Sequence, residues 1–121
     1  LLFGVLFLGE ERGEEALLFM QSVTTPHLSF ILVNPFSLDQ SYAPVLKESE
    51  RSVLQVERDQ ELCFHVLCAM KRPLPDSTIN LKCPIAVNPD KRIAMQIILD
   101  TDEYHMRHPL SQFVPKEAAP C

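Results

Sequence analysis

Two neighbouring stretches decide the fold, LCFHVLCAM at Leu62–Met70 and INLKCPIAVNP at Ile79–Pro89. In the first stretch, apolar residues occupy every second position, which is the period of a β-strand; they are Leu62, Phe64, Val66, Cys68 and Met70. The opposite face of this predicted strand is largely apolar too, with Cys63, His65, Leu67 and Ala69. We therefore predict a strand that is buried on both faces, as expected inside a closed or strongly curved sheet.

The second stretch predicts one continuous strand over Ile79–Val87. Its alternation places Leu81, Cys83, Ile85 and Val87 on one face and Asn80, Lys82, Pro84 and Ala86 on the other. Pro84 has no N–H to donate to a neighbouring strand. We therefore expect this strand to lie at an edge of the sheet there, or to carry a bulge.

Working outward, four more short apolar runs predict strands, at Val5–Leu8, Ala16–Gln21, Leu28–Val33 and Arg92–Leu99. Turn signals separate the runs, which is typical of an all-β domain. The ten prolines in 121 residues are hard to fit into helices, because proline lacks an N–H and clashes with the preceding turn. The sequence therefore predicts a mainly β chain, of a length that suits one domain with one core.

One segment is predicted to be helical. Lys47–Gln55 is polar, with Ser49 as its N-cap and Val53 and Leu54 as its buried contacts. After Leu110, residues 111–121 show no periodicity, and we expect a mobile C-terminal tail there.

An internal echo links FILVNP at Phe30–Pro35 with PIAVNP at Pro84–Pro89. Each is an apolar strand that ends in Asn-Pro, where asparagine can bond its own backbone and the residue before proline is extended. We interpret the echo as two strands stopped by the same turn chemistry; the alternative is a duplicated half-barrel.

The charge composition narrows the choice of partners. Sixteen acidic and eleven basic residues give a net charge of −5 with histidine neutral. Direct binding to nucleic acid is disfavoured, because phosphate contacts need clusters of lysine and arginine, whereas a basic protein partner fits well. The acidic runs at Gly9–Glu15 and Asp100–Glu103 predict solvated loops or a negative face that steers such a partner.

Neither a membrane span nor a disulfide framework is expected. No apolar run approaches the roughly 20 residues that cross a bilayer. Leu1–Leu8 lacks the basic flank and cleavage site of a signal peptide, so we interpret it as an internal strand. The cysteines contain no CxxC pair and are expected to be buried reduced thiols, as in a reducing compartment; they are Cys63, Cys68, Cys83 and Cys121.

Signs of catalysis are weak. His105 and His108 have the spacing of two metal ligands on a helix, and Asp100, Asp102 and Glu103 lie nearby. Pro109 disfavours a helix at His108, however, and no third ligand stands at a persuasive spacing. The sequence contains no GxSxG, GxGxxG or P-loop motif. We therefore expect a binding module, with a small metal-dependent enzyme as a remote alternative.

Three blocks of the sequence carry a resemblance. They are Gln21–Val23 with Pro26–Phe30 and Val33–Phe36; Asn80–Leu81 with Pro84–Ile85, Val87–Pro89 and Gln96–Leu99; and Tyr104 with Arg107–Leu110. In order and spacing they resemble the conserved blocks of FliW, a family of bacterial flagellar assembly factors. The similarity covers roughly Leu6–Leu110, so that a FliW-like domain over residues 1–110 precedes the 111–121 tail.

The resemblance implies a small antiparallel β-barrel-like domain with one short helix, located in the cytoplasm, with no enzyme activity and no cofactor. Members of the family bind flagellin before export, and they bind CsrA, the translational regulator that represses flagellin synthesis on flagellin mRNA. Partner exchange would relieve that repression. Flagellin would be met through an apolar groove or a sheet edge, and the acidic charge would aid encounter with CsrA.

Six positions in the resembling blocks are candidate partner-binding residues: Asn34, Asn80, Asn88, Tyr104, Arg107 and His108. Each has a structural alternative, since Asn-Pro units shape turns and the closing motif can anchor the last strand. Family members usually begin with further strands, which here are absent or reduced to Leu1–Leu8. We expect a monomer, although a sheet edge exposed by missing strands would favour artefactual pairing.

Overall fold

The computed structural model describes residues 3–7, 17–25 and 27–113. Within these ranges, eight strands form one antiparallel sheet: β1 (Phe3–Phe7), β2 (Leu17–Ser22), β3 (Ser29–Val33), β4 (Cys63–Ala69), β5 (Thr78–Ile79), β6 (Ile85–Asn88), β7 (Ile93–Gln96) and β8 (His108–Pro109). One α-helix, α1 (Glu48–Leu54), and four 3₁₀ turns accompany it in the described residues; the turns are Pro35–Ser37, Asp59–Glu61, Leu74–Asp76 and Leu110–Phe113.

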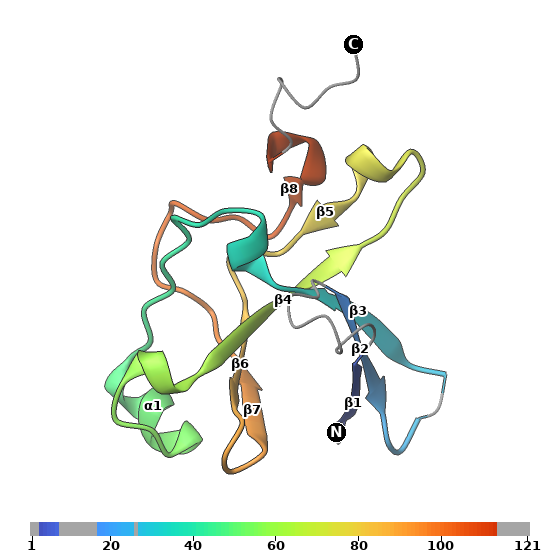
Figure 1. Ribbon diagram of the computed structural model, residues 1–121. Coiled ribbons are helices and arrows are strands. Elements are labelled where there is room, and N and C mark those ends of the chain that lie inside the picture. The colour runs from blue at the N-terminus through green and yellow to red at the C-terminus, as the bar shows by residue number, and fades with distance from the viewer. Residues whose placement is uncertain (1–2, 8–16, 26, 114–121) are drawn as a thin grey trace.

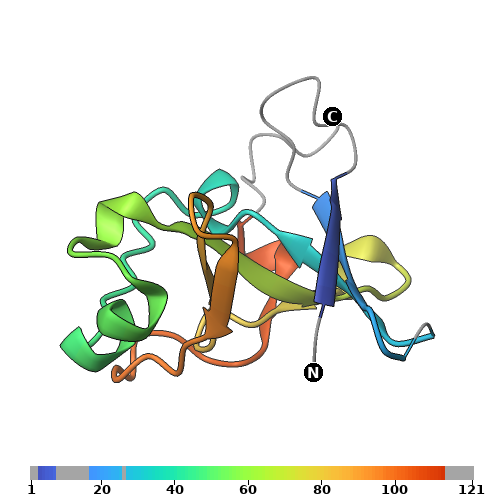
Figure 2. The ribbon, with the colours of Figure 1, turned by 90° about the horizontal axis from the view of Figure 1, so that it is seen from below.

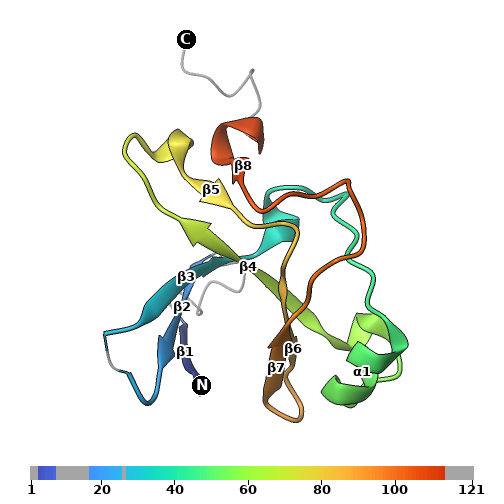
Figure 3. The ribbon, with the colours of Figure 1, turned by 180° about the vertical axis from the view of Figure 1, so that it is seen from behind.

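Strand β4 organises the sheet, as its two apolar faces predict. It pairs with β3 through residues 66–68, with β5 through residues 68–69 and with β6 through residues 63–65. Figures 1 and 3 show β4 crossing the middle of the molecule, with β1–β3 forming one wing and the β6–β7 hairpin another. From below, the two wings stand apart at different places along β4 (Figure 2). The sheet is curled into a half-barrel, which confirms the predicted barrel-like antiparallel fold with one short helix.

The main core lies on the face of β4 that carries Phe64 and Val66, which are 7% and 0% exposed. Helix α1 and the loops before and after it cover this face, and Tyr42, Leu46 and Leu54 pack into it. The opposite face of β4 is only half covered: His65 and Leu67 are partly buried, whereas Cys63 and Ala69 are exposed. The prediction that β4 is buried on both faces is therefore wrong for this second face, because the half-barrel leaves it partly open to solvent.

A smaller apolar cluster occupies the open face. Leu18, Leu32 and Ile85 are its buried members, and Met20, Leu67 and Val87 pack against them. These residues come from both wings and from the strand between them, since Leu32 pairs with Leu67 and Ile85 pairs with His65. The cluster therefore lines the inner side of the half-barrel and extends to Phe30, which is 36% exposed.

The predicted strand over Ile79–Val87 is wrong as a continuous element. Ile79 and Ile85 are six positions apart in the chain, whereas their partners on β4, Cys68 and His65, are only three positions apart. The extra length leaves the sheet as an arch over residues 80–84. The arch forms where expected, because Pro84 has no N–H to donate to a ladder.

At its ends the arch continues the neighbouring pairings, since the Ile97 N–H donates to the Pro84 carbonyl and the Leu99 N–H to the Lys82 carbonyl; further hydrogen bonds hold its middle. Asn80 Oδ1 accepts from the Cys83 N–H at 2.9 Å. The Leu81 and Lys82 N–H groups both donate to the His105 carbonyl at 3.1 Å. Leu81 is 1% exposed, so the arch inserts a side chain into the main core.

Helix α1 agrees with the prediction in place but not in its details. Its N-cap residue is Lys47, whose N–H donates to Glu50 Oε1, so Ser49 is not the N-cap and lies in the first turn. Leu54 is buried as predicted, but Val53 is 60% exposed, which overturns its predicted core contact. Gln55 ends the helix in the left-handed conformation with φ of 60°.

The segment after Leu99 contains a short last strand at the closing motif and a turn that the sequence did not suggest. Strand β8 pairs His108–Pro109 with β5, and a 3₁₀ turn over Leu110–Phe113 follows it. The Phe113 ring lies 6.2 Å from the His108 ring. The predicted tail therefore begins inside a packed turn, while residues 114–121 lie outside the described residues.

Several other predictions can be placed. In the described residues the cysteines are free, but only Cys83 is buried; Cys68 is partly buried and Cys63 is exposed, so the expectation of buried thiols is wrong for these two. Asp100, Asp102 and Glu103 are solvated, and Gly9–Glu15 lies outside the described residues. In the part of the chain that the structure describes, no helix is long and apolar enough to cross a membrane.

Candidate functional site

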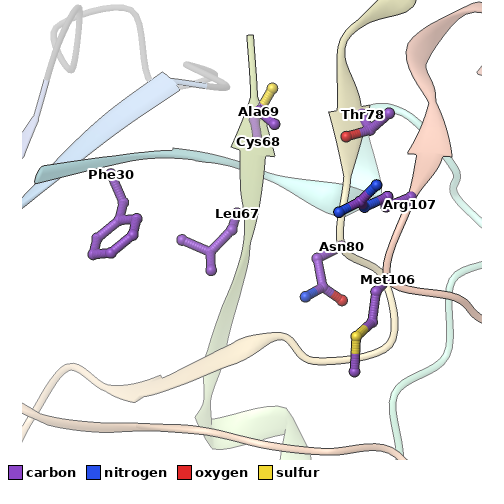
Figure 4. Close-up of a pocket in the computed structure, with 8 residues that line it drawn as sticks. All are labelled: Phe30, Leu67, Cys68, Ala69, Thr78, Asn80, Met106 and Arg107. Carbon is purple, nitrogen blue, oxygen red and sulfur yellow. The ribbon is translucent and has the colours of Figure 1, made fainter.

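A shallow surface pocket of about 210 Å³ opens on the inner side of the half-barrel (Figure 4). Strands β3, β4 and β5 and the loop before β8 contribute its lining. Phe30, Leu67 and Met106 are among its apolar lining residues, and Asn80 and Arg107 supply polar groups. Phe30, Leu67 and Asn80 project toward the same side of the sheet in Figure 4, so the pocket continues the inner apolar cluster.

The Asn80 side chain is oriented by the arch. Its Oδ1 accepts from the Cys83 N–H, which can only donate, so the amide orientation is fixed and Nδ2 is directed away from that bond. The Asn80 N–H itself donates to the Leu67 carbonyl at 3.0 Å, which continues the pairing of β5 with β4 for one more residue. The Asn80 Oδ1 atom is thus used in a structural hydrogen bond, and the NH₂ group remains available to a ligand.

Arg107 and Met106 reach the pocket through the same arch. The His105 carbonyl accepts two N–H groups of the arch, which fixes the chain just before Met106 beside Asn80. Met106 is 57% exposed. Within the described residues, no hydrogen bond or ion pair engages the Arg107 guanidinium. The guanidinium extends from this loop toward β5 (Figure 4) and offers a free cation beside an apolar surface.

His108 has a structural role on the far side of this loop. It is 8% exposed, its Nε2 accepts from the His105 N–H at 2.8 Å, and its Nδ1 lies 3.0 Å from Gln112 Oε1. Because a backbone N–H can only donate, Nε2 is the unprotonated nitrogen and Nδ1 donates to Gln112. Both ring nitrogens are therefore occupied.

This geometry gives no support to the metal hypothesis. The His105 and His108 rings are stacked with centroids 5.4 Å apart, an arrangement in which His108 has no free lone pair for a metal. Across the residues that the structure describes, no group of three or more histidine, cysteine or acidic side chains gathers into a candidate metal site.

The two Asn-Pro asparagines act in the fold, at positions remote from each other in the sheet. Asn34 Oδ1 accepts from the Phe36 N–H at 2.9 Å and caps a 3₁₀ turn. Asn88 is 4% exposed; its Nδ2 donates to the Leu54 carbonyl at 2.7 Å, and its Oδ1 accepts from the Asp90 and Lys91 N–H groups. Both strands are thus stopped by asparagine turn chemistry, as we interpreted the echo.

Tyr104 also joins distant segments of the fold. Its hydroxyl accepts from the Ala43 N–H at 2.9 Å, and its ring meets the Tyr42 ring edge-on at a centroid distance of 4.7 Å. Tyr42 in turn donates from its hydroxyl to the Leu81 carbonyl at 2.7 Å. Burial, with smaller contributions from Tyr104 and Cys83, raises the pKa of Tyr42 well above its usual value.

Of the six candidate residues, the structure brings Asn80 and Arg107 together at the pocket and places the other four in supporting contacts. Sequence reasoning missed the apolar part of the site, which is Phe30, Leu67 and Met106. Leu67 was visible as an apolar residue on the second face of β4. Met106 could not be identified from the sequence, because its loop lies against the sheet only through hydrogen bonds to the arch.

The pocket has the chemistry of a binding surface rather than of a reaction centre. Cys68 is the one thiol among its lining residues, and burial raises the pKa of that thiol, which disfavours the reactive thiolate. Of the described residues that line the pocket, none is a histidine or an acid that could act as a general base. The interactions that the pocket can offer a ligand are apolar contact and hydrogen-bond donation.

Comparison with known proteins places the chain in one family. The family model described as FliW protein matches residues 5–110. A flagellar assembly factor FliW of Geobacillus sp. strain WCH70 is 36% identical over 91 residues, which are 75% of this chain and 63% of that protein. One from Caldanaerobacter subterraneus is 29% identical over 109 residues, covering 90% of this chain and 73% of the relative.

A solved structure agrees with the sequence match. The crystal structure of a flagellar assembly factor FliW superimposes with a TM-score of 0.81 at 34% identity, covering 94% of this chain and 76% of the other. The family match over residues 5–110 includes the segments that form the arch and the pocket loop. This chain therefore belongs to the FliW family of flagellar assembly factors.

Proposed function

We propose that this chain is a non-enzymatic, cytoplasmic assembly factor that binds flagellin as a chaperone and also binds CsrA. Release of flagellin for export would free the factor to capture CsrA and so relieve repression of flagellin mRNA. The observation that carries the proposal is the FliW match over residues 5–110, together with relatives named flagellar assembly factors. The chain spans 63% of the length of the Geobacillus relative, and the binding of flagellin and CsrA is therefore part of this proposal.

The open inner face supports the flagellin part of the proposal. It combines a buried apolar cluster with exposed apolar side chains at its margin, such as Phe30 at 36% and Met106 at 57%. A partly exposed apolar surface of this kind is typical of a site that covers apolar segments of a partner. A chaperone for an export substrate needs such a surface, because the unassembled substrate exposes apolar segments of its own.

The charge of the chain supports the CsrA part. A net charge of −5 favours encounter with a basic protein and disfavours contact with RNA. One loop carries three exposed acidic residues, Asp100, Asp102 and Glu103. These residues would supply part of the attraction to a basic protein. We expect CsrA binding to weaken with added salt and flagellin binding to depend less on salt, because screening acts on charges rather than on apolar contacts.

The proposal is tested by calorimetric titration of this chain with flagellin and, separately, with CsrA from the same organism. Each titration is run at about 50 mM and at about 300 mM salt, between which the screening length falls by more than a factor of two. Saturable binding to both partners, with only the CsrA affinity falling markedly at high salt, supports the proposal. A folded, monomeric sample that binds neither protein would refute it and leave a binding module for another partner.

A further inference from the structure

The pocket at Asn80 and Arg107 adds polar groups to the inner apolar face, and the flagellin and CsrA proposal does not use these groups. Its walls are apolar, with Phe30, Leu67 and Met106, and its polar groups are mainly donors. A guanidinium has five N–H donors and no acceptor, and the free part of the Asn80 amide is its NH₂ group. Thr78, the other polar residue in the lining, has a hydroxyl that can also donate.

The size of the pocket limits what can enter. A volume of about 210 Å³ is below the roughly 300–1,000 Å³ of sites that enclose a whole small-molecule ligand. It matches one large aliphatic side chain with a polar group beside it. The remainder of such a ligand would lie on the inner apolar face, which continues from Leu67 and Phe30.

Charge decides which polar group fits. Arg107 stands at the pocket without an acid partner among the described residues, in a chain whose overall charge is negative. A carboxylate is the group that a guanidinium and an amide NH₂ recognise together, because it accepts several hydrogen bonds at once and carries the opposite charge. A cationic or donor-only group would leave these donors unpaired.

We propose that this pocket binds a leucine-like side chain and an adjacent carboxylate of a partner's peptide segment, with the side chain against Leu67 and Met106 and the carboxylate on Arg107 and Asn80. The site is built by the arch, which fixes the Asn80 amide through Cys83 and fixes the Arg107 loop through the His105 carbonyl. The inference stands apart from the identity of the partner.

The test uses a matched pair of small probes, N-acetyl-leucine and N-acetyl-leucinamide, which share the side chain and differ in the carboxylate. Each is titrated into the ¹⁵N-labelled chain at pH 7 and followed by NMR. We expect saturable shifts of the Leu67, Ala69, Asn80 and Arg107 amides, with millimolar affinity as is usual for fragments. The acid should bind about fivefold more tightly than the amide, as expected of one ion pair at an exposed arginine.

Two variants separate recognition from folding. Arg107→Gln removes the cation, and Asn80→Asp keeps an oxygen for the Cys83 N–H while replacing the NH₂ donor with a carboxylate. Both should abolish the preference for the acid over the amide and leave amide binding within about twofold of the original. Lys91→Gln removes a similar charge from the β6–β7 turn and should leave the preference intact.

The proposal fails if wild-type chain binds both probes equally, because Arg107 would then read no carboxylate. It also fails if shifts do not saturate by about 50 mM probe, well above the affinity expected of a fragment, or if they map to another face. Persistence of the acid preference in a folded Arg107→Gln variant would likewise refute it. None of these outcomes depends on whether flagellin or CsrA binds.

Discussion

Among the polar side chains of this fold, we expect the buried side chain of Asn88 to contribute most to stability through its hydrogen bonds. Its Nδ2 satisfies the carbonyl of Leu54 at the end of α1, while its Oδ1 organises the turn between β6 and β7. The last carbonyls of a helix have no partner within the helix, so this bond supplies one from a strand that is distant in sequence. Asn88→Ala breaks the link between the helix and the sheet.

The magnitude follows from what is left unpaired. Loss of the 2.7 Å bond leaves the Leu54 carbonyl buried without a donor, which costs about 1–3 kcal/mol. The Asp90 and Lys91 N–H groups belong to exposed residues, so water replaces their bonds at a cost of about 0.5 kcal/mol. We expect a total of about 2–3 kcal/mol, which is a fall in melting temperature of roughly 8–12 °C for a chain of this size.

Thermal unfolding followed by circular dichroism at pH 7.5 measures the effect, and Asn34→Ala is the matched control. Asn34 belongs to the other Asn-Pro unit, but its side chain makes one bond, to the Phe36 N–H in a partly buried cap. That loss should cost only about 1 kcal/mol. If Asn88→Ala is no more destabilising than Asn34→Ala, the reasoning that ranks the two by burial and by bond number is refuted.

Three further predictions concern side chains of the core and the inner face. Tyr42→Phe should cost about 1–2 kcal/mol at pH 7, because the Leu81 carbonyl loses its donor. Burial raises the pKa of Tyr42, so its contribution to the free energy of unfolding is complete below pH 10 and is lost progressively above that pH. In urea titrations from pH 8 to 11, the free energy of unfolding should therefore fall more steeply for the wild type than for the variant. Leu54→Ala should cost about 3 kcal/mol, as a 1% exposed side chain, whereas Val53→Ala, at 60% exposure, should stay within about 0.5 kcal/mol; equal effects would contradict the observed helix orientation. Burial lowers the pKa of His65, whose Nδ1 has no hydrogen-bond partner in the described structure. The folded chain therefore loses stability as the pH falls below about 6.5, because the unfolded chain takes up a proton on His65 more readily. His65→Leu should reduce this loss of unfolding free energy between pH 7 and pH 5, measured by urea titration at each pH.

The fold could be predicted from the sequence wherever alternation alone determined it. The pattern of β4 is the clearest case, because its two apolar faces predicted a curved sheet and the strand lies at the centre of the half-barrel. Leu54 was identified as the buried contact of the helix, but Val53 was not recognised as exposed. Adjacent residues on a helix point about 100° apart, and a seven-residue helix has too few turns to reveal which one faces the core.

The site could be predicted only in part. Asn80 and Arg107 stood out through the family resemblance, but the pocket that joins them exists because the chain leaves the sheet between β5 and β6. Pro84 signalled an irregularity, yet the sequence contains nothing that specifies three extra residues, nor that the His105 carbonyl would accept their N–H groups. Such contacts depend on tertiary packing across more than 20 residues of chain, which local pattern does not report.

The central claim is exchange of partners, and a displacement measurement tests it most directly. Fluorescently labelled CsrA is bound to this chain, flagellin is added in steps, and the anisotropy of the label is followed. Partner exchange predicts that the anisotropy falls saturably to the value of free CsrA, and that an unrelated apolar protein at the same concentration leaves it unchanged. If CsrA stays bound while flagellin also binds and the anisotropy rises, the two partners do not exchange and the account is wrong.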